Sequence, residues 1–162
     1  SEHKAEQERI RSIGAKLGYA AEVEKALENG LGAVDVSLVS GNARIAVEVS
    51  ITTPPEHEVS NILKCLSAGF DYVIATAPTR DRLRAIERSA WREITAADSP
   101  NVLFLRPEDI EEFLRSHRDE LDENKIMGYT VIVKNVPKSS EEKQRRRDRL
   151  NWLLNRAQTR EC

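Results

Sequence analysis

The fold is decided by two alternating segments and the turn between them: Val34-Asp35-Val36-Ser37-Leu38, Ser40-Gly41-Asn42 and Ile45-Ala46-Val47-Glu48-Val49-Ser50. Apolar side chains at alternate positions predict strands over residues 33–39 and 43–51, joined as a hairpin. One carboxylate interrupts each strand, at Asp35 and at Glu48. Because an unpaired buried carboxylate is costly, two of them facing one place indicate a divalent cation that neutralises them.

The segments around this hairpin alternate between helical and strand periodicity. We expect a helix over 2–17 and a strand over 19–27, which makes a three-stranded antiparallel meander with the hairpin. The later elements are a helix capped by Thr53 and ending near Gly69, a strand over 72–76, a helix from Thr79 to about Trp91, a strand over 102–105 and a helix over 108–118. This order predicts an α/β fold with a mixed β-sheet, an antiparallel meander plus crossover strands, flanked by helices.

The C-terminal quarter differs in composition from the rest. We expect a polar linker over 119–127, a strand over 129–133 and a last helix over 140–158. The predicted organisation is therefore an α/β core over residues 1–118 and a strand-helix extension over 119–162.

Composition narrows the class of protein. The 162 residues are 40% hydrophobic and 32% charged, which is typical of a globular chain rather than a disordered one. The apolar runs have the length of strands, so we expect no membrane span. The two cysteines, Cys65 and Cys162, form no disulfide framework, which favours a reducing, cytoplasmic setting.

The net charge of -2 hides a basic segment near the C-terminus. Such a cluster predicts sequence-independent contact with a nucleic-acid backbone, although interleaved acids also fit an ordinary solvated face. The residues that we expect to bind nucleic acid are Lys143, Arg145, Arg146, Arg147 and Arg149.

The element order and the two acids resemble the PD-(D/E)XK phosphodiesterase superfamily, whose fold is restriction-endonuclease-like. Over residues 2–77, Val34-Asp35 stands in the place of Pro-Asp, and Glu48-Val49-Ser50 stands in the place of Glu-x-Lys. The resemblance implies a Mg²⁺- or Mn²⁺-dependent DNA endonuclease that hydrolyses phosphodiester bonds. Asp35, Glu48 and the Val49 carbonyl would be the metal ligands.

The resemblance also bears on partners. It implies double-stranded or branched DNA as the substrate and allows a homodimer, since many members of the family dimerise to cut two strands. The chain begins with Ser1, so we leave open that it is a domain of a larger DNA-processing, mobile-element or defence protein.

Ser50 departs from the family pattern because a short neutral hydroxyl cannot replace the lysine that stabilises charge on the phosphate. One interpretation is that Lys64 of the following helix supplies the missing cation, assisted by Glu58 and Asn61, which share its polar ridge. The alternative is a catalytically inactive nuclease-like domain that acts as a DNA-binding or protein-docking module. A third is an unrelated α/β binding domain. The candidate catalytic residues are Asp35, Glu48, Ser50, Glu58, Asn61 and Lys64.

Overall fold

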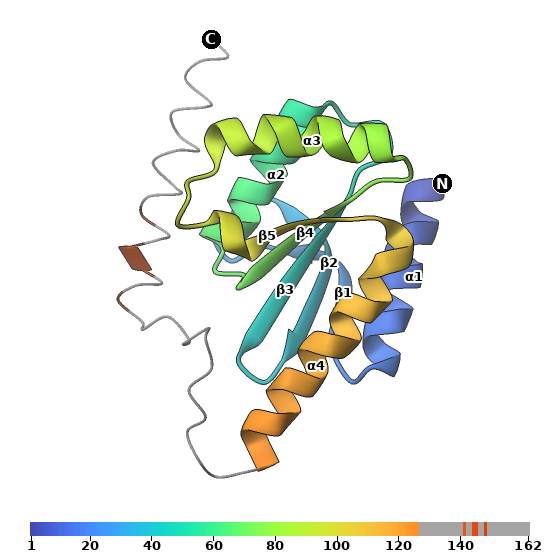
Figure 1. Cartoon of the computed structure of the whole chain (residues 1–162), viewed down its shortest axis with the longest axis vertical. Coiled ribbons are helices and arrows are strands. Elements are labelled where there is room, and N and C mark those ends of the chain that lie inside the picture. Colours follow the sequence, from blue (N-terminus) through green and yellow to red (C-terminus); the bar gives the residue numbers. More distant parts are fainter. Residues whose placement is uncertain (127–140, 142–143, 146–147, 149–162) are drawn as a thin grey trace.

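The computed structural model describes residues 1–126, 141, 144–145 and 148. The helices are α1 (Glu2–Lys16), α2 (Pro55–Ser67), α3 (Arg80–Glu93) and α4 (Ile110–Ile126), and the strands are β1 (Ala20–Ala26), β2 (Ala33–Ser40), β3 (Ala43–Val49), β4 (Tyr72–Thr76) and β5 (Val102–Leu105). Short 3-10 turns over Ser99–Asn101 and Pro107–Asp109 precede β5 and α4. Figure 1 shows these elements as an α/β fold built on one sheet.

The sheet is mixed, and its spatial order follows the chain, β1-β2-β3-β4-β5. The first three strands pair antiparallel, as tight turns require, whereas β3–β4 and β4–β5 pair parallel through the crossover helices α2 and α3. The antiparallel meander and the crossover strands predicted from sequence are therefore confirmed.

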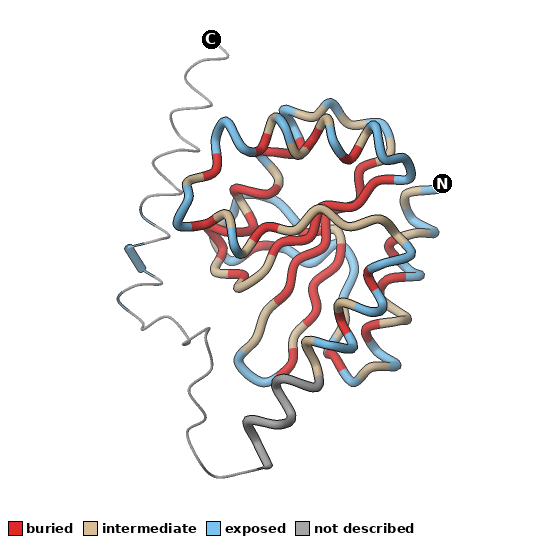
Figure 2. Tube along the Cα trace, in the orientation of Figure 1, coloured by how far each residue is buried: buried red, intermediate tan, exposed pale blue. Residues whose placement is uncertain are grey.

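Helices cover both faces of the sheet, and each face has its own apolar core. Figure 1 shows α1 beside α4 in one layer, with α2 and α3 in the other. Val36, Leu38 and Val47 pack with Ile10 of α1 and Leu114 of α4. On the opposite face, the core joins the sheet to α2 and α3 through residues that include Ala46, Val73, Leu66 and Ile86. The buried stretches in Figure 2 accordingly follow the central strands and the inner helix faces.

Most predicted element limits agree with the structure to within a few residues, but three details are wrong. Pro54, rather than Thr53, is the N-cap of α2, and it provides no side-chain cap bond. A 3-10 turn at Pro107–Asp109 precedes α4. That helix continues to Ile126, so the predicted polar linker over 119–127 is helical up to that residue.

The predicted C-terminal elements fall largely outside the described residues. The strand predicted over 129–133 lies there entirely, and within 140–158 only residues 141, 144, 145 and 148 are described, all of them helical. The proposed division at residue 118 falls within α4 and remains a prediction. In the part of the chain that is described, no helix has the length and apolar character needed to cross a membrane.

Gly14 packs directly against side chains of the sheet. A Cβ added to it would lie 2.5 Å from Leu38 Cδ2, and Leu38 is fully buried and cannot easily yield. Although alanine is about 1 kcal/mol better than glycine inside a helix, we expect Gly14→Ala to lower the free energy of unfolding by roughly 1–3 kcal/mol through overpacking. Urea denaturation measures this, with exposed Lys16→Ala as the control. An unchanged or higher stability would show that α1 can move away without cost.

Candidate functional site

The regular alternation of β2 breaks at Asp35. Val34 packs into the core under α2 and α3, whereas Val36, two residues on, packs into the core under α1 and α4. Opposite this point, Glu24 of β1 has a positive φ of 49°. The antiparallel register of β1 and β2 leaves Glu24 and Asp35 without a pairing partner in the adjacent strand. Val34 and Val36, on either side of Asp35, therefore point to opposite faces of the sheet, and β2 does not keep a strict alternation at this residue.

Asp35 is held by three hydrogen bonds. Its Oδ2 accepts from the Val49 backbone N–H at 2.7 Å and lies 3.2 Å from His3 Nε2, while its Oδ1 accepts from Gln7 Nε2 at 3.0 Å. The carboxylate thus ties β2 to the end of β3 and to the first turns of α1. Its side chain remains 21% exposed. The sequence pattern gave no sign that His3 and Gln7 reach this acid.

Glu48 occupies the other side of β3. It is only 3% exposed, and its Oε1 lies 3.3 Å from Cys65 Sγ of α2, whose thiol donates to it. Burial above all, together with the negative charges of Asp35 and Glu58, raises the pKa of Glu48 to about 8 against the lowering effect of Lys64 and the Cys65 bond. The structure therefore brings Asp35 and Glu48 within electrostatic reach while bonding them to different helices.

The polar ridge predicted on α2 points partly into this site. Glu58 is 3% exposed and accepts a hydrogen bond from Asn61 Nδ2 at 3.3 Å. Lys64 is half-buried, and its Nζ lies 3.9 Å from the position that a Cβ of Gly32 would occupy, in the loop before β2. Of the groups that lower the pKa of Glu48, Lys64 has the largest effect. The long lysine side chain therefore reaches the neighbourhood of the acids although its backbone position faces away from the core.

Ser50 is almost fully buried, with 1% exposure, and it holds an arginine that the sequence pattern did not reveal. Arg82, in the first turn of α3, donates from Nη2 to Ser50 Oγ at 2.7 Å and from Nε to both Ser50 Oγ and the Ser50 carbonyl at 3.1 Å. Its Nη2 also donates to the Thr53 carbonyl. Thus a guanidinium stands beside Ser50, and only the tertiary structure brings these distant residues together.

The donors at this site fit a divalent cation by their chemistry but not as a preformed cage. Asp35, Glu48 and Glu58 supply oxygen ligands of the type that Mg²⁺ prefers, and their mutual repulsion is what a cation would relieve. Among the described residues, no group of three or more His, Cys, Asp and Glu side chains is arranged to hold a metal ion. Val49 presents its N–H to Asp35, and its carbonyl remains the predicted third ligand.

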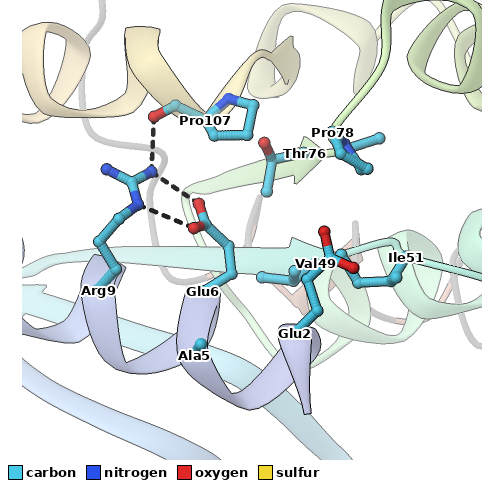
Figure 3. A pocket seen from close by; sticks show the side chains of 10 residues that line it. Glu2, Ala5, Glu6, Arg9, Val49, Ile51, Thr76, Pro78 and Pro107 are labelled. Atoms are coloured by element: carbon cyan, nitrogen blue, oxygen red, sulfur yellow. Dashed lines mark hydrogen bonds and ion pairs between the residues drawn. The ribbon is translucent and has the colours of Figure 1, made fainter.

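A pocket of about 240 Å³ lies on the α1 side of the same region. Figure 3 shows Glu6 and Arg9 of α1 at its rim, with Arg9 donating to Glu6 and to the carbonyl of Pro107. Val49 and the buried Thr76 form part of its wall. The pocket therefore borders the Asp35 side of β3, whereas Glu48 faces α2 on the other side.

The nucleic-acid contacts predicted near the C-terminus remain a prediction. Arg145 is exposed, and the other four, Lys143, Arg146, Arg147 and Arg149, lie outside the described residues. Comparison with models of known protein families and with curated proteins found no match to this chain. The assignment of a function consequently depends on the residues themselves.

Proposed function

We propose that this chain is a nuclease-like domain of the PD-(D/E)XK type that hydrolyses DNA phosphodiester bonds with a divalent metal ion. The observation that carries the proposal is that Asp35 on β2, Glu48 on β3 and Glu58 on α2 lie close enough for the charges of Asp35 and Glu58 to raise the pKa of Glu48, with Glu48 and Glu58 almost completely buried. Acids are rarely kept inside a fold without a partner, because a hydrophobic residue would be more stable there. The helix, meander, helix and strand order of α1 to β4 supports the same restriction-endonuclease-like fold.

Each residue of the site has a part in this proposal. Asp35 and Glu48 would hold Mg²⁺ or Mn²⁺, which supplies Lewis-acid stabilisation of the phosphate and an activated water. His3 and Gln7 position the Asp35 carboxylate through their contacts with it. Lys64 carries the positive charge that stabilises the developing charge on the phosphate. Glu58, bonded to Asn61, adds negative charge beside the metal ligands.

Cleavage of plasmid and branched DNA in the presence of Mg²⁺ or Mn²⁺ tests this function. We expect the wild-type chain to cleave, and we expect Glu48→Gln and Lys64→Met each to reduce the rate by about 100-fold or more, as removal of a transition-state-stabilising group does. Glu56→Gln, an exposed change on the same helix, is the matched control and should leave the rate unchanged. Equal rates in all four proteins would remove Glu48 and Lys64 from the mechanism.

A second candidate is a catalytically inactive domain of the same fold that binds DNA or docks a protein. One observation favours it: the place of the family lysine is taken by a serine whose hydroxyl is engaged by Arg82. The same assay separates the two candidates, because DNA binding without cleavage by any of the proteins would select the inactive domain.

A further inference from the structure

Helix α3 carries a row of arginines on the face that points away from the sheet. Its inner face is buried through Leu83, Ile86 and Ala90. On the outer face, exposed arginines recur at every fourth position, which places them in one slowly turning row along the helix. We name this row the α3 arginine row; its members are Arg80, Arg84, Arg88 and Arg92.

These arginines are not neutralised by neighbours. Elsewhere in the described residues, Arg9, Arg11 and Arg115 form ion pairs with glutamates three or four positions away. None of the four side chains of the α3 arginine row has a hydrogen bond or ion pair with a described residue.

The acids of α3 offset the charge of the row only in part. Asp81 lies toward the outer face in the first turn, while Glu87 is a hydrogen-bond partner of Trp91 Nε1 at 3.4 Å and Glu93 is the last residue of the helix. The four arginines of the row outnumber these three acids, so the outer face carries a small net positive charge over about 18 Å, the rise of twelve helical residues.

The row begins beside the candidate site. Arg82 lies in the same first helical turn as Arg80 but points inward, and its bonds to Ser50 and Thr53 hold the start of α3 against the end of β3. Ser50 is two residues from Glu48 along the chain. A polyanion lying along α3 would therefore arrive near the C-terminal end of β3, close to Glu48.

We propose that the outer face of α3 binds the phosphate backbone of double-stranded DNA, with the α3 arginine row contacting the phosphates and leading the duplex toward the acidic site. The choice of DNA rests on the proposed function. Phosphates repeat along a strand every 3.4 Å of the duplex axis, so the length of the row spans several of them. Contacts of this kind fix position without reading sequence.

Fluorescence anisotropy of the full chain with labelled duplexes of unrelated sequence tests this surface, with Ca²⁺ in place of Mg²⁺ to prevent cleavage during titration. Replacing all four arginines of the row by glutamine should weaken binding at least about tenfold and lower the slope of log K against log salt by roughly 3–4. Replacing them by lysine keeps the charge and should retain most of the affinity. Circular dichroism confirms that each variant is folded.

Two further variants serve as controls. Glutamine at Arg9, Arg11, Arg106 and Arg115 removes the same charge from arginines that are ion-paired, and it should change affinity much less. Glutamine at the basic positions of 143–149 tests the C-terminal contact predicted from sequence. Loss of binding in either of these variants, with none in the α3 variant, would overturn the proposal, as would equal wild-type affinity for polyglutamate and for duplex DNA.

The proposed DNA-binding surface and the proposed nuclease activity can be refuted independently of each other. If the wild-type chain cleaves DNA and the α3 variant binds and cleaves DNA equally well, the proposed DNA-binding surface is refuted and the proposed function stands. Salt-dependent binding through α3, without cleavage in Mg²⁺ or Mn²⁺, would refute the enzyme and leave the surface standing.

Discussion

Replacing Glu48 by glutamine is expected to raise the free energy of unfolding at neutral pH by roughly 3 kcal/mol. The Glu48 carboxyl has a pKa of about 8 in the folded chain, against an ordinary value of 4.5, chiefly because it is buried and secondly because Asp35 lies near. Between these two pH values the folded chain keeps a proton that the unfolded chain has released. Each pH unit in this window therefore lowers wild-type stability by about 1.4 kcal/mol.

The pH dependence follows directly from this difference. Below the unfolded-state pKa both states are protonated, and above about 8 both are ionised, so the decline is confined to the interval between them. Glutamine stays neutral, can still accept from the Cys65 thiol and should remove the decline. Urea denaturation at a series of pH values measures both effects, with exposed Glu56→Gln as the control. A wild-type curve as flat as that of Glu48→Gln would contradict the burial of an ionisable acid at this position.

The same experiment with Mg²⁺ examines the metal site without an activity assay. A cation that binds Glu48 in the folded chain favours the ionised carboxylate, so it should flatten the wild-type decline and raise the melting temperature. Glu48→Gln should respond much less. Identical responses of the two proteins to Mg²⁺ would show that Glu48 does not bind the metal ion.

Ser50→Lys, which would create the Glu-x-Lys pattern that the proposed function lacks at this position, is expected to destabilise the wild-type chain by about 3 kcal/mol or more. Ser50 is buried, and the guanidinium of Arg82 already lies against its hydroxyl. A lysine there would place a second cation beside the first in the interior. Arg82→Ala alone should cost about 1–3 kcal/mol, because the Ser50 and Thr53 carbonyls lose their donor.

The two changes together should be less harmful than their sum. Removing the guanidinium frees both the space and the electrostatic environment for a lysine, so we expect a favourable coupling of about 1–3 kcal/mol in a double-mutant cycle. Arg84→Ala, an exposed change on the same helix, should have little effect and controls for loss of helix charge. Additive effects of Ser50→Lys and Arg82→Ala would show that Arg82 does not oppose a cation at position 50.

Local patterns were sufficient for the framework of this protein. Alternation over 33–39 and 43–51, the Gly-Asn turn and the apolar strand over 72–76 predicted the meander and the crossovers, because strand and helix periodicities are properties of short segments. The acids at Asp35 and Glu48 were visible for the same reason: each interrupts an otherwise apolar strand. The helical continuation to Ile126 was missed because a polar segment carries no apolar stripe to reveal it.

The sequence by itself thus determined the α/β class, the order of the elements and the pair of acids at the ends of adjacent strands. Only the tertiary structure decided that Asp35 and Glu48 bond to different helices, that burial raises the pKa of Glu48, and that Arg82 fills the place beside Ser50. The physical reason is that these properties depend on burial and on contacts between residues far apart in the chain. The periodicity of one segment does not reveal the burial of a residue or its contacts with distant residues.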